Sequence, residues 1–336
     1  MFGPGGHLLS VTQFDRPGLE ALFDLADRLR PVQRGQARCQ ALQGAVVASL
    51  FFEPSTRTRL SFESAFCQLG GSVISTTGFT FSSMAKGESI HDTARVVSGY
   101  CDAMVVRHPD AGSVAQFAQA SVVPVINAGD GAGEHPSQAL LDVYTMRAEL
   151  AVRGKSLDGA TLAVLGDLRY GRTVHSLLQL LGLYHDVHVR LFSPHALQLP
   201  ARFHDLVRAS GNTLAECGSV AEAITGADVI YATRVQKERL SEEDAAQLRL
   251  EGDLLNAELL HTHASPDVIV MHPLPRDSRH NSYDLSVDVD QEPGLAIFHQ
   301  TDNGIPIRMA IFATTLGIAD TVADELEPVS RLRRTR

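Results

Sequence analysis

The sequence predicts an α/β protein built from two doubly wound parallel-sheet domains that face a cleft. Short apolar runs of strand length alternate with helical segments along almost the whole chain. A length of 336 residues is long for one core and suits two domains. A polar break, Arg153–Gly159, lies near the middle. We therefore expect domains over residues 1–150 and 151–302, with a C-terminal helix of about 303–336 packing back on the first.

The first half opens with an amphipathic helix and a buried strand. Pro17–Leu29 carries apolar residues at helical spacing, and Ala45–Phe52 is a largely apolar run. Leu60–Leu69 has the spacing of a helix that follows this strand directly. Two further strand-like runs and a helical stretch come next: Ala103–Val106, Val122–Ile126 and Ser137–Leu150.

The second half repeats this alternation of strands and helices. Its strand-like runs are short and rich in valine, isoleucine and leucine, as buried strands are. The expected strands are Thr161–Leu165, Val187–Phe192, Val229–Ala232 and Val268–Met271, and the clearest helix is Thr173–Leu181. Strands separated by helices in this way favour parallel sheets in both halves.

Composition excludes several classes of protein. The formal charge of −10 argues against general nucleic-acid binding, and no apolar stretch has membrane-spanning length, so we expect neither kind of partner. Met1–Ser10 lacks the features of a signal peptide. Four scattered cysteines without Cys-x-x-Cys spacing indicate a reducing compartment, no disulfide framework and no zinc site, which favours a cytoplasmic protein.

The segment Glu53–Arg59 carries the strongest chemical signal. It reads Glu-Pro-Ser-Thr-Arg-Thr-Arg and lies where the Ala45–Phe52 strand gives way to a helix. Free backbone N–H groups and the positive end of the helix dipole favour an anion at such a place. Three hydroxyls and two arginine forks suit a phosphate, although an ordinary helix N-cap with solvated arginines is the alternative. The segment is not a Walker loop, because it lacks the glycines and the Gly-Lys ending.

Other polar clusters follow predicted strands in the first half. Arg107 comes directly after one strand and is suited to a phosphate or a carbonyl oxygen, or else to a structural salt bridge. His135 and Gln138 share one face at a helix start, where they suit a carbonyl and an amide. Capping, with Ser137 as the N-cap, is the alternative role of that segment. The loop Ser82–Ser89 carries a lone Lys86, whose default interpretation is a solvated surface lysine.

The second half adds cationic groups at its strand ends. Arg172 opens a helix, and Thr233–Arg239 follows a strand with Arg234 and Gln236, so two arginines converge in a manner that suits a dicarboxylate. Two prolines around Leu274 fix a backbone that can aim a carbonyl at a ligand N–H, and one of these bonds is a candidate cis bond. The glycines of Gly166–Gly171 do not have the spacing of a dinucleotide fingerprint.

These clusters bind and neutralise anions but supply no nucleophile. The sequence has no Ser-His-Asp pattern and no metal-ligand spacing. We therefore expect direct transfer between two bound substrates, driven by orientation and charge stabilisation, without a metal or a cofactor.

Taken together, the motifs resemble the transcarbamoylase family over about Leu8 to Ala323. They occur in that family's order: Phe-x-Glu-Pro-Ser-Thr-Arg-Thr-Arg, Ser82–Lys86, Arg107-His-Pro, His135-Pro-Ser-Gln138 and His272-Pro-Leu-Pro275. Within the family the chain is similar to aspartate carbamoyltransferase catalytic chains rather than ornithine enzymes. It has Pro273 where ornithine enzymes carry cysteine, and Thr233–Arg239 differs from the ornithine loop.

The resemblance implies transfer of the carbamoyl group of carbamoyl phosphate to L-aspartate, in pyrimidine synthesis. The first domain would bind carbamoyl phosphate and the second aspartate. It implies a homotrimer with shared active sites, because Ser82 and Lys86 reach a neighbour's site in this family, and it leaves open whether regulatory chains bind. The implied catalytic residues are Arg57, Thr58, Lys86, Arg107, His135 and Gln138, and the implied substrate-binding residues are Ser55, Thr56, Ser82, Arg172, Arg234, Gln236, Leu274 and Pro275.

Two rival functions follow from the same residues. A transcarbamoylase with another acceptor, such as ornithine, should present carboxylates to a distal ammonium, whereas Arg234 and Gln236 do the opposite. A non-catalytic sensor of carbamoyl phosphate should have lost His135, Gln138 or Lys86, and all three are present.

Overall fold

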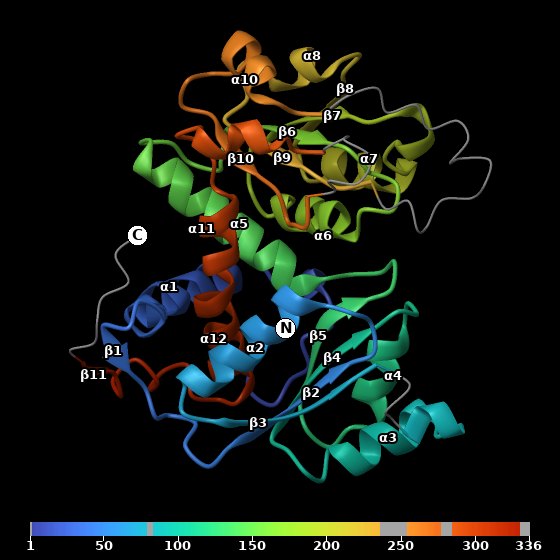
Figure 1. The fold of residues 1–336 in the computed structure, drawn as a ribbon, viewed down its shortest axis with the longest axis vertical. Helices are drawn as coiled ribbons and strands as arrows, with labels where there is room; N and C mark the ends of the chain where they lie inside the picture. Colours follow the sequence, from blue (N-terminus) through green and yellow to red (C-terminus); the bar gives the residue numbers. More distant parts are fainter. Residues whose placement is uncertain (1, 79–82, 236–253, 277–283, 330–336) are drawn as a thin grey trace. The chain divides into compact units, whose positions relative to one another are not determined.

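The structure, a computed structural model, describes residues 2–78, 83–235, 254–276 and 284–329 (Figure 1). Its contacts divide the chain into two compact units. Unit 1 comprises Met1–Ser137 and Asp302–Arg336, and unit 2 comprises Gln138–Thr301. This division falls inside helix α5 (Pro136–Val152), upstream of the polar break at which the sequence suggests a boundary.

Unit 1 is built on a parallel sheet with the strand order β3-β2-β4-β5. The described strands are β2 (Val46–Phe51), β3 (Ser72–Thr77), β4 (Ala103–His108) and β5 (Val125–Asp130). A short antiparallel pair, β1 (Ala37–Arg38) with β11 (Glu327–Pro328), joins the two sequence segments of this unit. The core on one side of the sheet packs Met104 and Val106 against Phe52 and Phe117.

The helices of unit 1 are α1 (Arg16–Gln33), α2 (Thr56–Gln68), α3 (Ile90–Val97), α4 (Ser113–Ala120) and α12 (Gly304–Thr315). Asp15 caps α1 by accepting from the Gly18 N–H at 2.8 Å. Helix α12 is buried on nearly all sides and contacts α1 and α2, beside which it lies in Figure 1. Its Phe312 packs edge-on against Phe62 and Phe66, so α12 joins the core of unit 1.

Unit 2 is built on a second parallel sheet with the order β10-β9-β6-β7-β8. Its described strands are β6 (Thr161–Leu165), β7 (His188–Phe192), β8 (Thr213–Glu216), β9 (Val229–Ala232) and β10 (Ile269–Met271). The described helices beyond α5 are α6 (Arg172–Leu181), α7 (Ala201–Ala209), α8 (Val220–Ile224), α10 (Ala257–His263) and α11 (Ile297–Asp302). Short 3-10 turns complete the elements: η1 (Val11–Gln13), η2 (Ser83–Lys86), η3 (His195–Leu197) and η6 (Val287–Gln291).

The prediction of two α/β units with parallel sheets is confirmed, with differences at particular elements. The expected strand Val122–Ile126 is wrong at its start, because β5 begins only after Pro124, whose ring carries no N–H for the ladder. Ser137 is not an N-cap, because α5 already begins at Pro136. No helix in the described part of the chain combines the length and apolar character that a bilayer crossing requires.

Candidate active site

The predicted phosphate and carbonyl residues of unit 1 follow two neighbouring strands. The strand order places β2 beside β4, and the chain proceeds from this pair to opposite edges of the sheet. The carboxyl ends of β2 and β4 therefore flank a topological switch point, where open α/β sheets bind ligands. Ser55–Thr58 follow β2, and Arg107 lies at the end of β4.

Helix α2 begins within the predicted anion-binding segment. Ser55 occupies the N-cap position with extended backbone, yet its side chain makes no capping hydrogen bond. Thr56 and Arg57 are exposed in the first turn, Thr58 is buried, and that turn contains no acidic residue. The hydroxyls and N–H groups at this helix start thus suit an anion better than a closed cap.

Thr58 and His135 lie together, although they come from different elements. The Thr58 hydroxyl is 3.4 Å from His135 Nε2, and both residues are buried. Arg107 pairs with Glu53, since its Nη2 is 2.8 Å from Glu53 Oε2, and it also donates to the Ala128 carbonyl at 3.2 Å. The alternative role of Arg107 in a salt bridge is therefore real, and Glu53 and Ala128 hold the guanidinium at the end of β4.

One of the glycines after β5 allows a close approach between two backbone segments of the protein. Gly131 has φ +54°, and a Cβ there would lie 2.6 Å from the Pro109 carbonyl oxygen and 2.5 Å from the Ala111 nitrogen. Only a glycine fits this backbone approach. The turn after β5 is thereby packed on the turn after β4, the strand that carries Arg107 near its end.

A second switch point lies in unit 2, between β6 and β9. Arg172 opens α6 after β6 and is 8% exposed, and Arg234 follows β9. The two connecting segments are in tight contact, because a Cβ on Gly166 would lie 2.3 Å from the Thr233 carbonyl oxygen. Both arginines therefore follow the central strand pair of their sheet, the usual ligand position.

The segment after β10 has an unusual backbone. The Leu274–Pro275 bond is cis, which confirms that one of the two proline bonds is cis, and Leu274 has φ +57°. A left-handed leucine costs roughly 1–3 kcal/mol and persists only when surrounding contacts fix it. The Leu274 N–H donates to His272 Nδ1 at 2.8 Å, and His272 Nε2 is 2.6 Å from Asp284 Oδ2.

For the remaining predicted residues the structure gives fewer contacts or none. Gln138 lies in the first turn of α5 and donates to Asp142 Oδ1 at 2.8 Å. Lys86 is exposed at the end of η2. Ser82 and Gln236 lie outside the described residues.

Two family models match consecutive parts of the chain. Residues 6–148 match the aspartate/ornithine carbamoyltransferase carbamoyl-P binding domain. Residues 158–315 match the Asp/Orn binding domain of the same family.

The chain belongs to the aspartate/ornithine carbamoyltransferase family.

Individual carbamoyltransferases are similar over nearly the full length. The aspartate carbamoyltransferase catalytic subunit of Dichelobacter nodosus is 50% identical over 99% of this chain and 95% of its own length. The aspartate transcarbamoylase of Trypanosoma cruzi, in complex with carbamoyl phosphate and aspartate, has a TM-score of 0.83 and 38% identity. That match covers 93% of this chain and 97% of the other. A structure of the same enzyme with carbamoyl aspartate and phosphate also has a TM-score of 0.83 and 38% identity, with coverage of 93% and 96%.

Sequence reasoning missed a buried polar group of this carbamoyltransferase family member. Asp142, Tyr231 and Gln300 are fully buried in unit 2, and Tyr231 and Gln300 both donate to the Asp142 carboxylate. Asp142 offered the one available signal, since it is a carboxylate four residues after Gln138, on the same helical face and flanked by Leu141 and Val143.

Proposed function

We propose that the chain transfers the carbamoyl group of carbamoyl phosphate to the amine of L-aspartate, giving N-carbamoyl-L-aspartate and phosphate for pyrimidine biosynthesis. The observation that carries this proposal is the match, over 93% of the chain, to an enzyme described with both substrates and with both products. The aspartate nitrogen attacks the carbamoyl carbon, a C–N bond forms and the C–O bond to phosphate breaks. Phosphate leaves with the electron pair and takes up the proton lost from nitrogen.

Unit 1 is the proposed site of carbamoyl phosphate. Ser55, Thr56, Arg57 and Thr58 would hold its phosphate through hydroxyls, a guanidinium and the N–H groups that begin α2. Thr58, Arg107 and His135 would donate to the carbamoyl oxygen, where negative charge develops as nitrogen attacks. The 3.4 Å approach of Thr58 to His135 supports a shared target for these two side chains.

Unit 2 is the proposed site of aspartate and of the carbamoyl NH₂ group. Arg172, Arg234 and Gln236 would hold the two carboxylates, because paired cations select a dianion over an acceptor with a distal ammonium. Gln138 and the backbone carbonyls of Leu274 and Pro275 would accept from the carbamoyl NH₂. The left-handed Leu274 supports this assignment, since constrained backbone of this kind concentrates at ligand sites.

The proposed assembly is a homotrimer in which Ser82 and Lys86 complete the active site of a neighbouring subunit. The exposed position of Lys86 supports such a role. Regulatory chains are a further proposed partner, because the Dichelobacter nodosus relative is named a catalytic subunit. We also propose that the enzyme works in the cytoplasm, which fits four cysteines that are all free thiols.

Acceptor specificity tests the proposal. The purified chain is incubated with carbamoyl phosphate and L-aspartate, L-ornithine or no acceptor, and the products are identified by mass spectrometry. We expect carbamoyl aspartate and phosphate in equal amounts with aspartate, and neither product above background otherwise. Formation of citrulline would show that ornithine, and not aspartate, is the acceptor. Binding of carbamoyl phosphate without turnover would show that the chain is a sensor.

A further inference from the structure

Asp142 is the centre of a buried hydrogen-bond network in unit 2. Its side chain lies on α5 and has no exposed surface. Oδ1 accepts from Gln138 Nε2 at 2.8 Å and from Gln300 Nε2 at 2.7 Å. Oδ2 accepts from the Tyr231 hydroxyl at 2.7 Å. One carboxylate thus holds groups from α5, α11 and β9.

The carboxylate fixes which end of the Gln138 amide is presented to other partners. A carboxylate oxygen only accepts, so the NH₂ end of Gln138 must face Asp142. The carbonyl oxygen is then the end that this half-buried side chain offers elsewhere. Gln138 is therefore set to recognise an N–H donor, and a flipped amide would place two acceptor oxygens, of Gln138 and Asp142, face to face.

A second arm of the network reaches Leu274. Because the Gln300 NH₂ faces Asp142, its carbonyl oxygen is free to accept from the His272 backbone N–H, at 3.0 Å. His272 in turn accepts from the Leu274 N–H through Nδ1, while its Nε2 contacts Asp284. Asp142 is thereby linked through two residues to the left-handed backbone of Leu274.

A third arm runs through Tyr231. Its hydroxyl also bonds to the side chain of Thr173, the residue after Arg172 in α6. Burial, and then the Asp142 carboxylate, raise the pKa of Tyr231 well above its ordinary value, so the phenol stays a donor. All three arms end at or beside segments to which the proposed function assigns substrate contacts.

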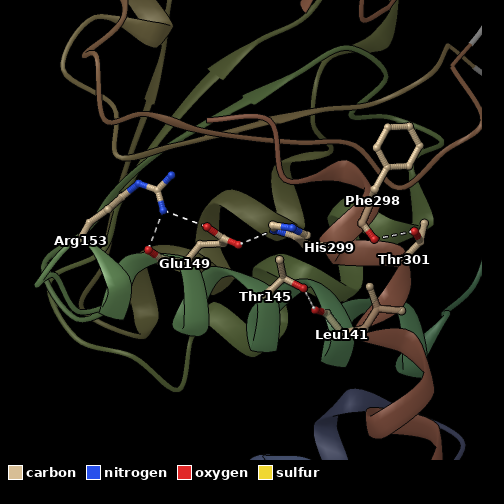
Figure 2. Close-up of polar contacts among 7 residues, drawn as sticks. All are labelled: Leu141, Thr145, Glu149, Arg153, Phe298, His299 and Thr301. Atoms are coloured by element: carbon tan, nitrogen blue, oxygen red, sulfur yellow. Dashed lines mark hydrogen bonds and ion pairs between the residues drawn. The ribbon is translucent and has the colours of Figure 1, made fainter. Parts of the chain in front are cut away.

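Helices α5 and α11 are also joined by a second contact that serves as a comparison. Two turns beyond Asp142, Glu149 Oε1 lies 3.1 Å from His299 Nδ1, and Glu149 Oε2 lies 2.9 Å from Arg153 Nη1 (Figure 2). The His299 side chain is 67% exposed. Loss of this contact affects the packing of the same two helices without touching Gln138 or Leu274.

We propose that Asp142 is a positioning residue for donor specificity, which orients the acceptor groups of Gln138 and Leu274 toward the NH₂ of the carbamoyl donor. This inference rests on the proposed function. It implies that the enzyme selects carbamoyl phosphate over acetyl phosphate, in which a methyl group replaces NH₂. A site built around acceptors for N–H groups rejects such an analogue, because its polar groups stay unpaired.

Donor competition tests the role of Asp142. The ratio of kcat/KM for carbamoyl phosphate to that for acetyl phosphate is measured in the wild type, Asp142→Ala, Asp142→Asn and the control Glu149→Gln. The inhibition constant of inorganic phosphate is measured in parallel, since phosphate contacts are assigned to Ser55–Thr58 of unit 1. Thermal unfolding of each variant reports on folding.

We expect Asp142→Ala to lower the donor ratio by about tenfold or more, the effect of losing one or two oriented hydrogen bonds. Asp142→Asn keeps one acceptor oxygen, so its donor ratio should lie between those of the wild type and Asp142→Ala, about threefold below the wild type. Glu149→Gln should keep the wild-type ratio, and phosphate inhibition should stay within about twofold in all variants.

The results separate this inference from the function on which it rests. If Asp142→Ala does not fold, Asp142→Asn decides, and a wild-type ratio in that variant overturns the proposal. Equal loss of activity with both donors, at an unchanged ratio, overturns it as well and leaves Asp142 a structural residue. A wild type that transfers neither donor to aspartate contradicts the proposed function itself.

Discussion

The side chain of Arg107, proposed to contact substrate, is held in one position by neighbouring groups of the protein. Its guanidinium is held by the Glu53 carboxylate at 2.8 Å and by the Ala128 carbonyl, and its side chain is 11% exposed. Such contacts restrict the side chain in advance, which would lower the cost of orienting it for the role that we propose in catalysis. A guanidinium with five donors can keep a protein carboxylate and still donate to a carbamoyl oxygen.

Replacement of Arg107 should therefore affect turnover more than folding. We expect Arg107→Ala to lower kcat by about a hundredfold or more at saturating substrates, since one donor to a developing oxyanion is worth that much. Arg16→Ala is the control, because Arg16 also forms a 2.8 Å pair with a glutamate of unit 1, Glu20. Steady-state kinetics and circular dichroism check both; turnover of Arg107→Ala within about threefold of wild type would remove Arg107 from the mechanism.

At the scale of elements, apolar runs predicted the central strands of both sheets. Strands β2, β4, β6 and β9 are covered on both faces and therefore read as continuous apolar segments. Strands β3 and β8 lie at sheet edges, and at least half of the residues in Ser72–Thr77 and in Thr213–Glu216 are polar. β3 and β8 are only partly buried, so their sequences carry little apolar pattern, whereas the edge strands β5 and β10 are buried and were predicted from apolar runs.

Site residues that lie close to a strand in the sequence could be predicted, whereas contacts between residues far apart in the sequence could not. Ser55–Thr58, Arg172 and Arg234 lie in segments that follow strands and Arg107 lies near the end of one, so their place at strand ends could be read from the sequence. The bond between Asp142 and Gln300 joins residues 158 positions apart, and nothing in the sequence around Gln300 indicates this partner. Such pairs depend on the packing of α5 against α11, which only the folded chain defines.

Helix α6 gives unit 2 a pH-dependent stability. His175 is buried, and its ring stacks on that of Phe203 with the ring centroids 4.2 Å apart. Its Nε2 lies 3.0 Å from the Leu168 carbonyl oxygen. Burial lowers the pKa of His175 from 6.5 to about 4. The unfolded chain thus binds this proton below pH 6.5 while the folded chain does not, so stability falls as pH drops from 6.5 to 4.

We expect His175 to reduce the free energy of unfolding by about 2 kcal/mol between pH 7 and pH 5, at about 1.4 kcal/mol per pH unit below 6.5. Urea unfolding at the two pH values measures the change. His175→Gln has no titrating ring and should lose less stability over this interval. An equal loss in the variant and the wild type would show that His175 is not responsible.

At the scale of the whole molecule, the proposed trimer makes each active site depend on two chains. Lys86 would come from one subunit and Arg107 from its neighbour. A homotrimer of Lys86→Ala or of Arg107→Ala lacks one group at every site. A mixed trimer regains a native site wherever an Arg107→Ala chain donates Lys86 to a Lys86→Ala chain.

Random reassembly of the two variants in equal amounts should therefore recover activity. A site is native when the chain that supplies Lys86 is the Arg107→Ala variant and the chain that receives it is the Lys86→Ala variant. Each condition holds with a chance of one half, so about a quarter of all sites become native under cyclic symmetry. Each variant alone is the control and should stay near background. Mixed trimers that form, as judged by native mass spectrometry, but remain inactive would mean that each site is built within one chain.

The central claim, attack of the aspartate nitrogen on the carbamoyl carbon with phosphate as the leaving group, has a direct isotopic test. Carbamoyl phosphate labelled with ¹⁸O in the oxygen that bridges carbon and phosphorus is converted in the presence of aspartate, and both products are analysed by mass spectrometry. We predict that the label appears entirely in inorganic phosphate, and that unlabelled carbamoyl aspartate forms in equal amount. Label retained in the carbamoyl product, or phosphate release that is independent of aspartate, would contradict the account.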